Sequence, residues 1–358
     1  MKLIGRRVLL ISPEDWGACW LSKHHYASVL AERGNTVFFL GPRLFTEPPS
    51  ELPANVVLLD NPSIPPGLRH YPRALRHAVH RKLGAQLRRQ AGGDFDLVWS
   101  FDPCRLLDLD QVCPGSRRLF YLADIFGKCP WPVLARSAQL CLGCSGEILE
   151  GLRAHNPNSH FINHGFIEYP TDSYDFGTPG KNVVYAGNLA ARHLDVQRVA
   201  RLLDTYKDVN FHFFGDDGTG NLAQGRVLSP LVQQLQERPN AHVRGVVSPR
   251  ELASIYLAAD VLLLFYDPFD GVILWNTHKM MEYLGSGTPI LATRTRAYDD
   301  IADILRMHDD LDDYISALGS LLEGEPEGLS ERRVQYARDN IYSSQLRKIE
   351  ELLGHLHR

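Results

Sequence analysis

Short runs of apolar residues alternate with longer segments of helical spacing through the first half of the chain. The runs that predict buried strands are 6–12, 36–42, 56–60, 96–103, 118–124, 139–145 and 160–165. After the first run, residues 22–33 have amphipathic spacing, and Gly34 stands where a helix C-cap belongs. Strands that alternate with helices in this way predict a parallel sheet covered by helices on both faces.

A second series of the same kind follows the tract 168–181, whose Pro, Gly, Asp, Ser and Thr residues predict a linker. Its predicted strands are 182–187, 210–218, 242–248, 259–265 and 289–293. Ser248-Pro-Arg-Glu251 forms a capping box with proline at the first helical position, and residues 330–357 repeat apolar positions at helical spacing. A length of 358 residues favours two domains. We expect an N-terminal domain at 1–167, a second domain at 182–329, and a helical segment at 330–358 that packs back on the first.

The stretch 260–293 carries the densest set of polar candidates. It predicts a strand, a loop, a helix that Asn276 or Thr277 caps, and a second strand after Gly285 and Gly287. In an open parallel sheet, such a loop and helix N-terminus lie at the carboxyl ends of the strands, where ligands bind. The helix N-terminus with Lys279 would suit a pyrophosphate, and Glu282 would suit two ribose hydroxyls. The plain alternative is a surface lysine and a glutamate paired with His278.

Composition excludes several classes of protein. The net charge is −4, with 44% hydrophobic and 22% charged residues, which is typical of a folded soluble protein. No apolar run is long enough to span a bilayer, and the first residues lead directly into a strand without the features of a signal peptide. The six cysteines lie before residue 145, and with no export signal we expect reduced, buried thiols. Cys141 and Cys144 have the spacing of a zinc or redox pair, but no second pair accompanies them.

The helix predicted at 69–89 is basic, and no acidic residue occurs between Asn61 and Gly93. Its apolar residues form one stripe, which we expect to pack on the domain. The positive charge predicts association with an anionic membrane surface. Nucleic-acid binding is not expected, because few aromatic residues are interleaved and no RNA-binding motif is present.

Seven motifs in order across about 130 residues resemble the GT-B glycosyltransferases, especially the family 4-like group of bacterial envelope and exopolysaccharide enzymes. They are Asn163-His-Gly-Phe166, Val184-Tyr-Ala-Gly-Asn-Leu189, Phe213-Phe-Gly-Asp216, Val243-Arg-Gly-Val-Val247, Ala259-Asp-Val261, His278-Lys-Met-Met-Glu-Tyr-Leu284 and Gly287-Thr-Pro-Ile-Leu291. In the first half, Trp16, Ser22-Lys-His-His25 and Leu30-Ala-Glu-Arg-Gly34 look like the opening loop and helix of the same group. The resemblance implies two Rossmann-like, doubly wound α/β domains that face a cleft.

The resemblance also implies roles for single residues. Lys279 would contact the donor phosphates and Glu282 the ribose, with Asn276 and Thr277 at the helix start. Gly187 and Asn188 would let the donor approach the backbone, and Gly215 and Val246 would flank the base. Arg192 would neutralise phosphate, or it is a solvated arginine at a helix start. Trp16, His24, His25 and Asp102 are candidates for acceptor binding.

One departure from the family pattern concerns the reaction's stereochemistry. Retaining family 4 enzymes often carry a glutamate eight residues before the position of Glu282, where this chain has Leu274. Asp267 or Asp270 could substitute for it, or the main chain alone could hold the donor, so retention or inversion cannot be carried over. Asp124 ends a predicted strand and is our candidate for a catalytic base, with a helix N-cap as the alternative. Asp102 and His25 are weaker candidates for the same role.

The resulting hypothesis is a cytoplasmic glycosyltransferase, peripheral at the inner membrane face, that moves a sugar from a nucleotide-sugar donor to a glycan or lipid-linked acceptor. We expect no metal cofactor, because a helix N-terminus, a lysine and an arginine can together do what a divalent ion does in other enzymes. Asp108-Leu-Asp110 has the letters of an Asp-x-Asp metal motif, but it lies in the wrong domain. Two alternatives remain. One is a nucleotide-sugar epimerase, and the other is a degenerate GT-B protein that binds a sugar nucleotide or a partner without turnover.

Overall fold

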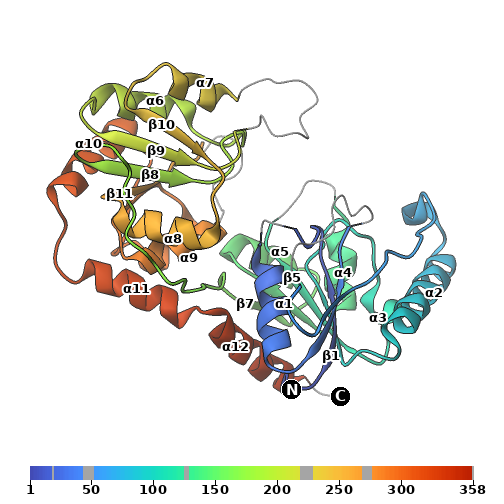
Figure 1. The fold of residues 1–358 in the computed structure, drawn as a ribbon. Helices are drawn as coiled ribbons and strands as arrows, with labels where there is room; N and C mark the ends of the chain where they lie inside the picture. The colour runs from blue at the N-terminus through green and yellow to red at the C-terminus, as the bar shows by residue number, and fades with distance from the viewer. Residues whose placement is uncertain (18–19, 43–51, 125–128, 218–228, 268–275, 357–358) are drawn as a thin grey trace. The chain divides into compact units, whose positions relative to one another are not determined.

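The chain forms two compact α/β units in a computed structural model that describes residues 1–17, 20–42, 52–124, 129–217, 229–267 and 276–356 (Figure 1). The first unit consists of Met1–His164 together with Tyr342–Arg358. The second consists of Gly165–Ile341. Each unit has its own parallel sheet with helices packed against it.

The first unit is built on a seven-stranded parallel sheet with the order β3-β2-β1-β4-β5-β6-β7. The strands are β1 (Arg7–Ile11), β2 (Thr36–Leu40), β3 (Val56–Leu58), β4 (Leu97–Ser100), β5 (Arg117–Leu122), β6 (Leu140–Gly143) and β7 (Ser159–Phe161). Their helices are α1 (Ser22–Glu32), α2 (Arg73–Ala91), α3 (Leu109–Val112), α4 (Trp131–Ser137), α5 (Gly146–Arg153) and α12 (Tyr342–His355). The strand order reverses between β1 and β4, which is where doubly wound sheets bind ligands.

The second unit has a six-stranded parallel sheet with the order β10-β9-β8-β11-β12-β13. The strands are β8 (Asn182–Ala186), β9 (Asn210–Phe214), β10 (Ala241–Gly245), β11 (Val261–Leu264), β12 (Ile290–Thr293) and β13 (Arg306–His308). The helices are α6 (Val196–Thr205), α7 (Pro230–Gln236), α8 (Pro249–Ala258), α9 (His278–Ser286), α10 (Leu311–Glu323) and α11 (Leu329–Asp339). Here the order reverses between β8 and β11.

Alternation along β8 explains how this sheet is buried on both faces. Val184 and Ala186 belong to the core that contains α8 and α9, whereas Val183 and Tyr185 belong to the core that contains α6 and α10. A strand buried on both sides is largely apolar, so β8, β9, β11 and β12 were visible in the sequence. Strand β10 was predicted as well, although its residues are half-buried or exposed. The sixth, β13, was not predicted, because Arg306, Met307 and His308 form no apolar run.

The chain divides at other places than the predicted boundaries. The expected linker packs within the second unit, where Phe176 is buried and its carbonyl oxygen accepts a hydrogen bond from Arg244 Nη2 at 2.8 Å. Helix α11 also belongs to the second unit and packs against α9. The guanidinium of Arg333, which is only 1% exposed, donates to Gly287 O and Ile304 O, both at 3.0 Å. The part of 330–358 that packs with the first unit is therefore Tyr342–Arg358.

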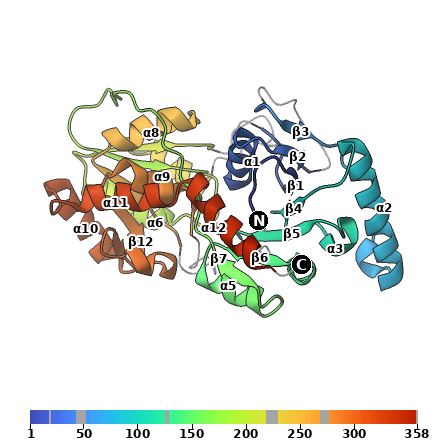
Figure 2. The same ribbon diagram turned by 90° about the horizontal axis from the view of Figure 1, so that it is seen from below.

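Helix α12 belongs to the first unit (Figure 2). The carboxylate of Glu350 anchors it there. Leu3 N donates to Glu350 Oε1 at 2.6 Å, and Arg33 Nη2 lies 2.8 Å from the same oxygen. Leu346 and Ile349 have no exposed surface, and Tyr342 packs edge-on against Tyr26 of α1. Among the described residues, the structure has no helix with the length and apolar character that a bilayer crossing requires.

Candidate functional site

Gly187 and Gly215 bring two backbone segments into contact at the carboxyl ends of β8 and β9. A Cβ atom on Gly215 would lie 1.8 Å from the carbonyl oxygen of Gly187, and Gly215 has a positive φ of 137°. The two strand ends are also joined by Gly187 N, which donates to Phe214 O at 2.8 Å. Only glycine fits at Gly215, so two half-buried backbone segments lie in contact beside the point where the strand order reverses.

Lys279 lies directly over Gly187. Its Nζ donates to the hydroxyl of Tyr185 at 3.1 Å and sits 4.3 Å from the centre of the Tyr185 ring. A Cβ atom on Gly187 would approach Lys279 Nζ to 2.2 Å. Burial lowers the pKa of Lys279 to about 7, against the opposing effect of Glu282. Among the described residues, no acidic group forms an ion pair with this ammonium, so its charge is available to an anionic ligand.

Glu282 lies one turn further along α9. Its Oε1 is 3.5 Å from His278 Nδ1, and its Oε2 accepts a long hydrogen bond of 3.5 Å from the Tyr256 hydroxyl. The pairing with His278 that sequence offered as the plain alternative is therefore present. Burial raises the pKa of Glu282, while Lys279 and the bond from Tyr256 act in the other direction. The side chain keeps 28% of its surface exposed, which leaves its carboxylate accessible to hydroxyl groups.

The start of α9 differs in detail from the predicted cap. Thr277 occupies the N-cap position, but its side chain makes no capping hydrogen bond. Its backbone N donates instead to the Tyr298 hydroxyl at 2.8 Å. Asn276 is buried. Leu274, which stands where the family often has a glutamate, and its possible substitute Asp270 lie outside the described residues. The other possible substitute, Asp267, is described, and its backbone N donates to His193 O at 2.8 Å.

Gly187, Gly215 and Lys279 together form what we call the cradle. The other predicted donor residues differ in whether they contact it. Asn188 Oδ1 accepts from Ala190 N at 2.8 Å and so shapes the turn after Gly187. Val246 is 77% exposed and follows Gly245, whose carbonyl accepts from Gly215 N at 2.7 Å. An exposed valine there suits contact with a flat ring. Arg192 is exposed and makes no recorded contact with the cradle among the described residues.

Asp124 follows β5 in the first unit and is half-buried. Burial raises its pKa, Lys23 lowers it and Glu14 raises it. Lys23, which is only 10% exposed at its side chain, pairs with Glu14. The first helix described after Asp124 is α4, whose N-cap residue is Pro130, so Asp124 caps no described helix. A carboxyl group with a raised pKa beside a cation has the properties of a general base.

Trp16 and His24 are packing residues rather than exposed acceptor contacts. His24 has no exposed surface, and its Nδ1 accepts from Leu21 N at 3.0 Å while its Nε2 lies 2.9 Å from Asp15 O. Both ring nitrogens are therefore used, and burial lowers the pKa of His24 to about 4. Trp16 is 2% exposed and packs edge-on against Phe39.

His25 is also buried. Its ring packs 5.1 Å from the ring of Tyr342 in α12, and burial lowers its pKa to about 4. An imidazole in this setting stays neutral at physiological pH. Its predicted role in binding an acceptor or in proton transfer has no support in its surroundings, because helix α12 covers it.

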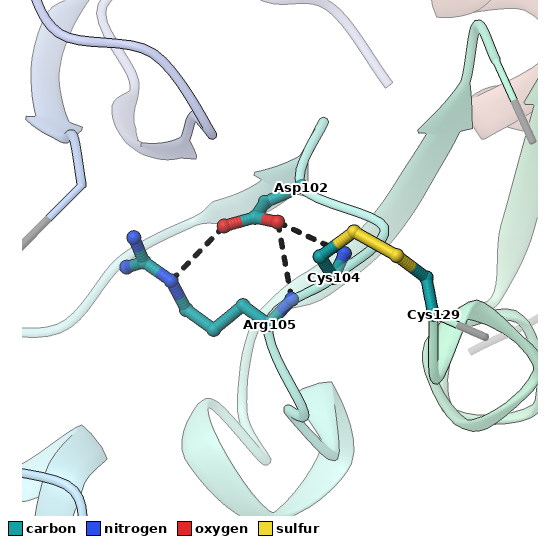
Figure 3. Close-up of a disulfide and its surroundings, with 4 residues drawn as sticks. All are labelled: Asp102, Cys104, Arg105 and Cys129. Atoms are coloured by element: carbon teal, nitrogen blue, oxygen red, sulfur yellow. Dashed lines mark hydrogen bonds and ion pairs between the residues drawn. A yellow bond between two sulfur atoms is a disulfide. The ribbon is translucent and has the colours of Figure 1, made fainter. Parts of the chain in front are cut away.

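Asp102 organises the loop after β4 (Figure 3). Its Oδ1 accepts from the backbone N of Cys104 and of Arg105, both at 3.0 Å, and its Oδ2 pairs with Arg105 Nε at 3.1 Å. The Arg105 guanidinium continues to Gly41 O at 2.7 Å, which ties this loop to the end of β2. Asp102 is 5% exposed, so its carboxylate holds two loops together and is not free to act as a base.

The prediction of reduced cysteines is wrong for one pair. Cys104 and Cys129 form a disulfide that joins the segments following β4 and β5 (Figure 3). Cys113, Cys141 and Cys144 are buried and belong to no disulfide among the described residues, and Cys19 lies outside these residues. Cys141 Sγ donates to Ala135 O and Cys144 Sγ to Ala123 O, at 3.5 Å and 3.2 Å. Their spacing thus reflects separate packing positions and not a shared metal or redox site.

The basic helix packs on the domain over half its length. Leu83 and Leu87 of α2 are buried, as predicted, but Leu75 is 49% exposed. The buried half contacts α3, where a Cβ atom on Gly84 would lie 1.9 Å from Val112 O. The amino-terminal half extends beyond that contact. In the described part of the chain, no group of three or more His, Cys, Asp or Glu residues is placed to hold a metal.

Sequence reasoning missed the tyrosines of the second unit. Each of three tyrosine hydroxyls forms a hydrogen bond with a candidate residue. The Tyr185 hydroxyl bonds to Lys279, the Tyr256 hydroxyl to Glu282 and the Tyr298 hydroxyl to Thr277. A tyrosine buried in a strand or helix resembles any core residue in the sequence. The available signal was the position of Tyr185, two residues before Gly187 on a strand that leads into the site.

Comparison with known proteins supports the architecture. No protein-family model matches the sequence, and no curated protein matches it. Among solved structures, the chain is similar to WaaG, a glycosyltransferase involved in lipopolysaccharide biosynthesis, with a TM-score of 0.60, 17% identity and coverage of 97% of this chain and 100% of that one. It is similar to the sucrose-phosphate synthase of Thermosynechococcus elongatus, with a TM-score of 0.67, 14% identity and coverage of 98% and 99%.

A third likeness is to Anabaena HepE in complex with UDP and glucose, with a TM-score of 0.62, 14% identity and coverage of 97% and 99%. Identities this low carry information about architecture only. The topology of the two sheets and these likenesses over the whole chain show that it has the two-domain α/β GT-B fold.

Proposed function

We propose that this protein is a glycosyltransferase that moves a sugar from a nucleotide-sugar donor to a glycan or lipid-linked acceptor. The second unit binds the donor and the first binds the acceptor. The observation that carries the proposal is the cradle of Gly187, Gly215 and Lys279, where an ammonium that has no acidic ion-pair partner among the described residues lies over half-buried backbone. This arrangement fits a diphosphate better than any other common ligand.

In this proposal the donor's diphosphate rests on the backbone at Gly187 and Gly215, and Lys279 supplies a positive charge. Glu282 accepts hydrogen bonds from two ribose hydroxyls, and Val246 packs on the base. As the bond between sugar and phosphate breaks, negative charge grows on the leaving diphosphate. A fixed ammonium and the amino end of α9 stabilise that charge, so no metal ion is required for this role.

Asp124 takes the proton of the acceptor hydroxyl as the sugar carbon becomes positively charged. Its raised pKa and its place at the carboxyl end of β5 support this role. The hydroxyl oxygen then bonds to the sugar carbon, and the nucleoside diphosphate leaves with the electron pair of the broken bond. Whether the sugar's configuration is retained or inverted stays open, because Leu274 and its neighbours lie outside the described residues.

We assign the protein to the family 4-like group and to the synthesis of envelope polysaccharides or glycolipids at the inner membrane face. Support comes from the motif order and from WaaG, whose role is in lipopolysaccharide biosynthesis. The exposed Leu75 and the arginines of α2 suit contact with anionic lipid. Vesicle flotation tests this part: no binding to anionic vesicles at low salt contradicts it.

The donor site is tested by calorimetric titration of UDP, GDP, TDP, ADP and CMP against wild type and Lys279→Ala. We expect one nucleotide to bind, and the variant to bind it at least about tenfold more weakly, because a charged hydrogen bond is lost. Lys207→Ala is the matched control, since Lys207 is an exposed lysine of the same unit. Equal affinity in all three proteins for every nucleotide contradicts the proposed donor site.

A glycosyltransferase, a degenerate binding protein and an epimerase differ in which reaction of the sugar nucleotide they catalyse, if any. Asp124→Asn is expected to bind the donor nucleotide normally but to transfer sugar at least about 100-fold more slowly, as is typical when a general base is lost. Asp94→Asn, which alters a carboxylate that is 91% exposed, is expected to retain activity. A wild-type protein that binds sugar nucleotides without transfer or hydrolysis supports the degenerate-protein alternative. Interconversion of the donor sugar without an acceptor supports an epimerase.

A further inference from the structure

A pocket of about 690 Å³ lies in the first unit, between α2, α3, α4 and the start of β5. The charged residues that line it are Arg73, Arg76, His77, Asp108, Asp110, Arg118 and Arg136. Four guanidinium groups and two carboxylates thus surround one hollow. The surplus of positive charge is unusual for a protein whose net charge is −4.

This pocket is separate from the proposed acceptor site. Arg118 is the second residue of β5, and Ser137 and Ala138 come directly before β6. The pocket therefore lies at the amino ends of these strands. Asp124 follows the carboxyl end of β5, so the two positions are at opposite edges of one parallel sheet. A ligand in the pocket would not occupy the space beside Asp124.

Both carboxylates already have partners within the pocket. Asp110 Oδ1 pairs with Arg118 Nη2 at 3.2 Å, and Arg118 also donates Nε to Ser137 O at 3.0 Å. Asp108 Oδ2 lies 3.4 Å from His77 Nε2, and its Oδ1 accepts from Gln111 N at 3.3 Å as the cap of α3. Asp110 is therefore paired with a guanidinium, whereas Asp108 faces an imidazole, and the four arginines of the pocket outnumber its two carboxylates.

The other three arginines have no carboxylate partner among the described residues. Each makes one recorded side-chain hydrogen bond to a neutral acceptor: Arg73 Nε to His77 Nε2 at 3.5 Å, Arg76 Nη1 to Arg69 O at 3.4 Å, and Arg136 Nη1 to His155 Nδ1 at 3.2 Å. A guanidinium has five N–H donors. Most donors on these three side chains are therefore unused around the same hollow.

Like charges around a concave surface repel one another, and the low-dielectric walls concentrate their field on an anion in the hollow. The planar fork of a guanidinium matches two oxygens of a phosphate group. We propose that this pocket binds an anion that carries one or more phosphate groups, and that Arg73, Arg76 and Arg136 hold it. The volume exceeds that of a phosphate ion alone, so the ligand is a phosphorylated sugar or a phospholipid headgroup.

The test is calorimetric titration of the full chain with pyrophosphate. The pocket variant is Arg76→Ala/Arg136→Ala, and the control is Arg81→Ala/Arg89→Ala, which removes the same charge from exposed positions of α2 that do not line the pocket. The donor cradle is unchanged in both, so its own binding of pyrophosphate cancels in the comparison. We expect the pocket variant to lose a binding event, or to bind at least about tenfold more weakly, while the control matches wild type.

A second arm identifies the source of the phosphate. Flotation with vesicles that contain phosphatidic acid, compared with vesicles of the same charge made with phosphatidylglycerol, reports a headgroup phosphomonoester. Pocket-dependent binding of pyrophosphate supports a soluble ligand, and pocket-dependent binding of phosphatidic acid vesicles alone supports a headgroup. If neither probe distinguishes the pocket variant from the control, the cluster acts only as general surface charge and the proposal is overturned.

Discussion

Lys279 is a residue whose charge depends on what is bound beside it. Burial lowers its pKa to about 7, and the diphosphate that we propose beside the ammonium would raise the pKa again because opposite charges favour the protonated form. The bound state therefore holds more protons than the free state above pH 7. Affinity for the nucleotide should fall as pH rises through and above 7, since a proton must be taken up for binding.

We predict uptake of about one proton per nucleotide at pH 8, where phosphate itself is fully ionised. Titration in two buffers of different ionisation enthalpy measures this number. Lys279→Arg, which keeps the charge but does not titrate in this range, should bind without uptake. Binding by the wild type at pH 8 with no proton uptake would show that Lys279 does not contact the phosphates.

Gly215 tests whether the close backbone contact under the site is required. Gly215→Ala places a Cβ 1.8 Å from Gly187 O, and we expect a loss of about 3 kcal/mol in the free energy of unfolding from overpacking and positive φ combined. Gly245→Ala is the control, because it has a positive φ of 73° but no atom within 4 Å of the new Cβ. It should cost about 1 kcal/mol. Similar losses in urea denaturation would mean that the contact relaxes cheaply.

Residue types indicated which residues gather at the carboxyl ends of the second sheet better than they indicated exposure in the first unit. Lys279, Gly187 and Gly215 come together as predicted, because each follows or faces a strand whose place in the sheet the sequence pattern indicates. Trp16, His24 and Asp102 looked equally exposed in the sequence but are buried. Their partners, Phe39, Asp15 and Arg105, could be named only once the loops were folded.

At the scale of elements, the disulfide links two strand ends that the sequence separates by 25 residues. Cysteine spacing could not indicate it, because the pairing depends on β4 and β5 being neighbours in the sheet. The bond connects the loop held by Asp102 with Cys129, just before α4 (Figure 3).

We predict that Cys104→Ser lowers the free energy of unfolding by about 3 kcal/mol, because the unfolded chain gains freedom when a loop of this length is opened. Dithiothreitol should lower the melting temperature of the wild type to about that of the variant and leave the melting temperature of the variant unchanged. A wild type insensitive to dithiothreitol, with its thiols shown to be reduced, would mean that the bond contributes nothing to stability.

Strand patterns were predictable where burial on both faces imposes apolar runs, as in β8 and β11. They failed at β13, where Arg306 and His308 are not buried and only pairing with β12 defines the strand. The prediction that the apolar stripe of the basic helix packs on the domain was correct only in part. Its second half is buried and its first half, with Leu75, is not, since helix periodicity indicates which face is apolar but not how far the neighbouring helix extends.

At the scale of the whole molecule, the position of α12 completes the first unit. We predict that Ile349→Ala, which removes a side chain with no exposed surface, costs about 2 to 5 kcal/mol in the stability of that unit. The fluorescence of Trp16 and Trp99, both in the first unit, reports its unfolding. Glu351→Ala, at an exposed position of the same helix, should change little. If Ile349→Ala changes the stability of the first unit as little as Glu351→Ala does, the packing of α12 does not contribute to that stability.

The same position of α12 has a consequence for synthesis on the ribosome. Residues 165–341 form a continuous unit that can fold as soon as it has emerged, whereas the first unit lacks α12 until residues 342–356 have been made. During that interval Tyr26 and His25 have no Tyr342 to cover them. The part of the protein made first is thus finished last, and nascent chains stalled before residue 342 should be selectively sensitive to protease within their first 164 residues.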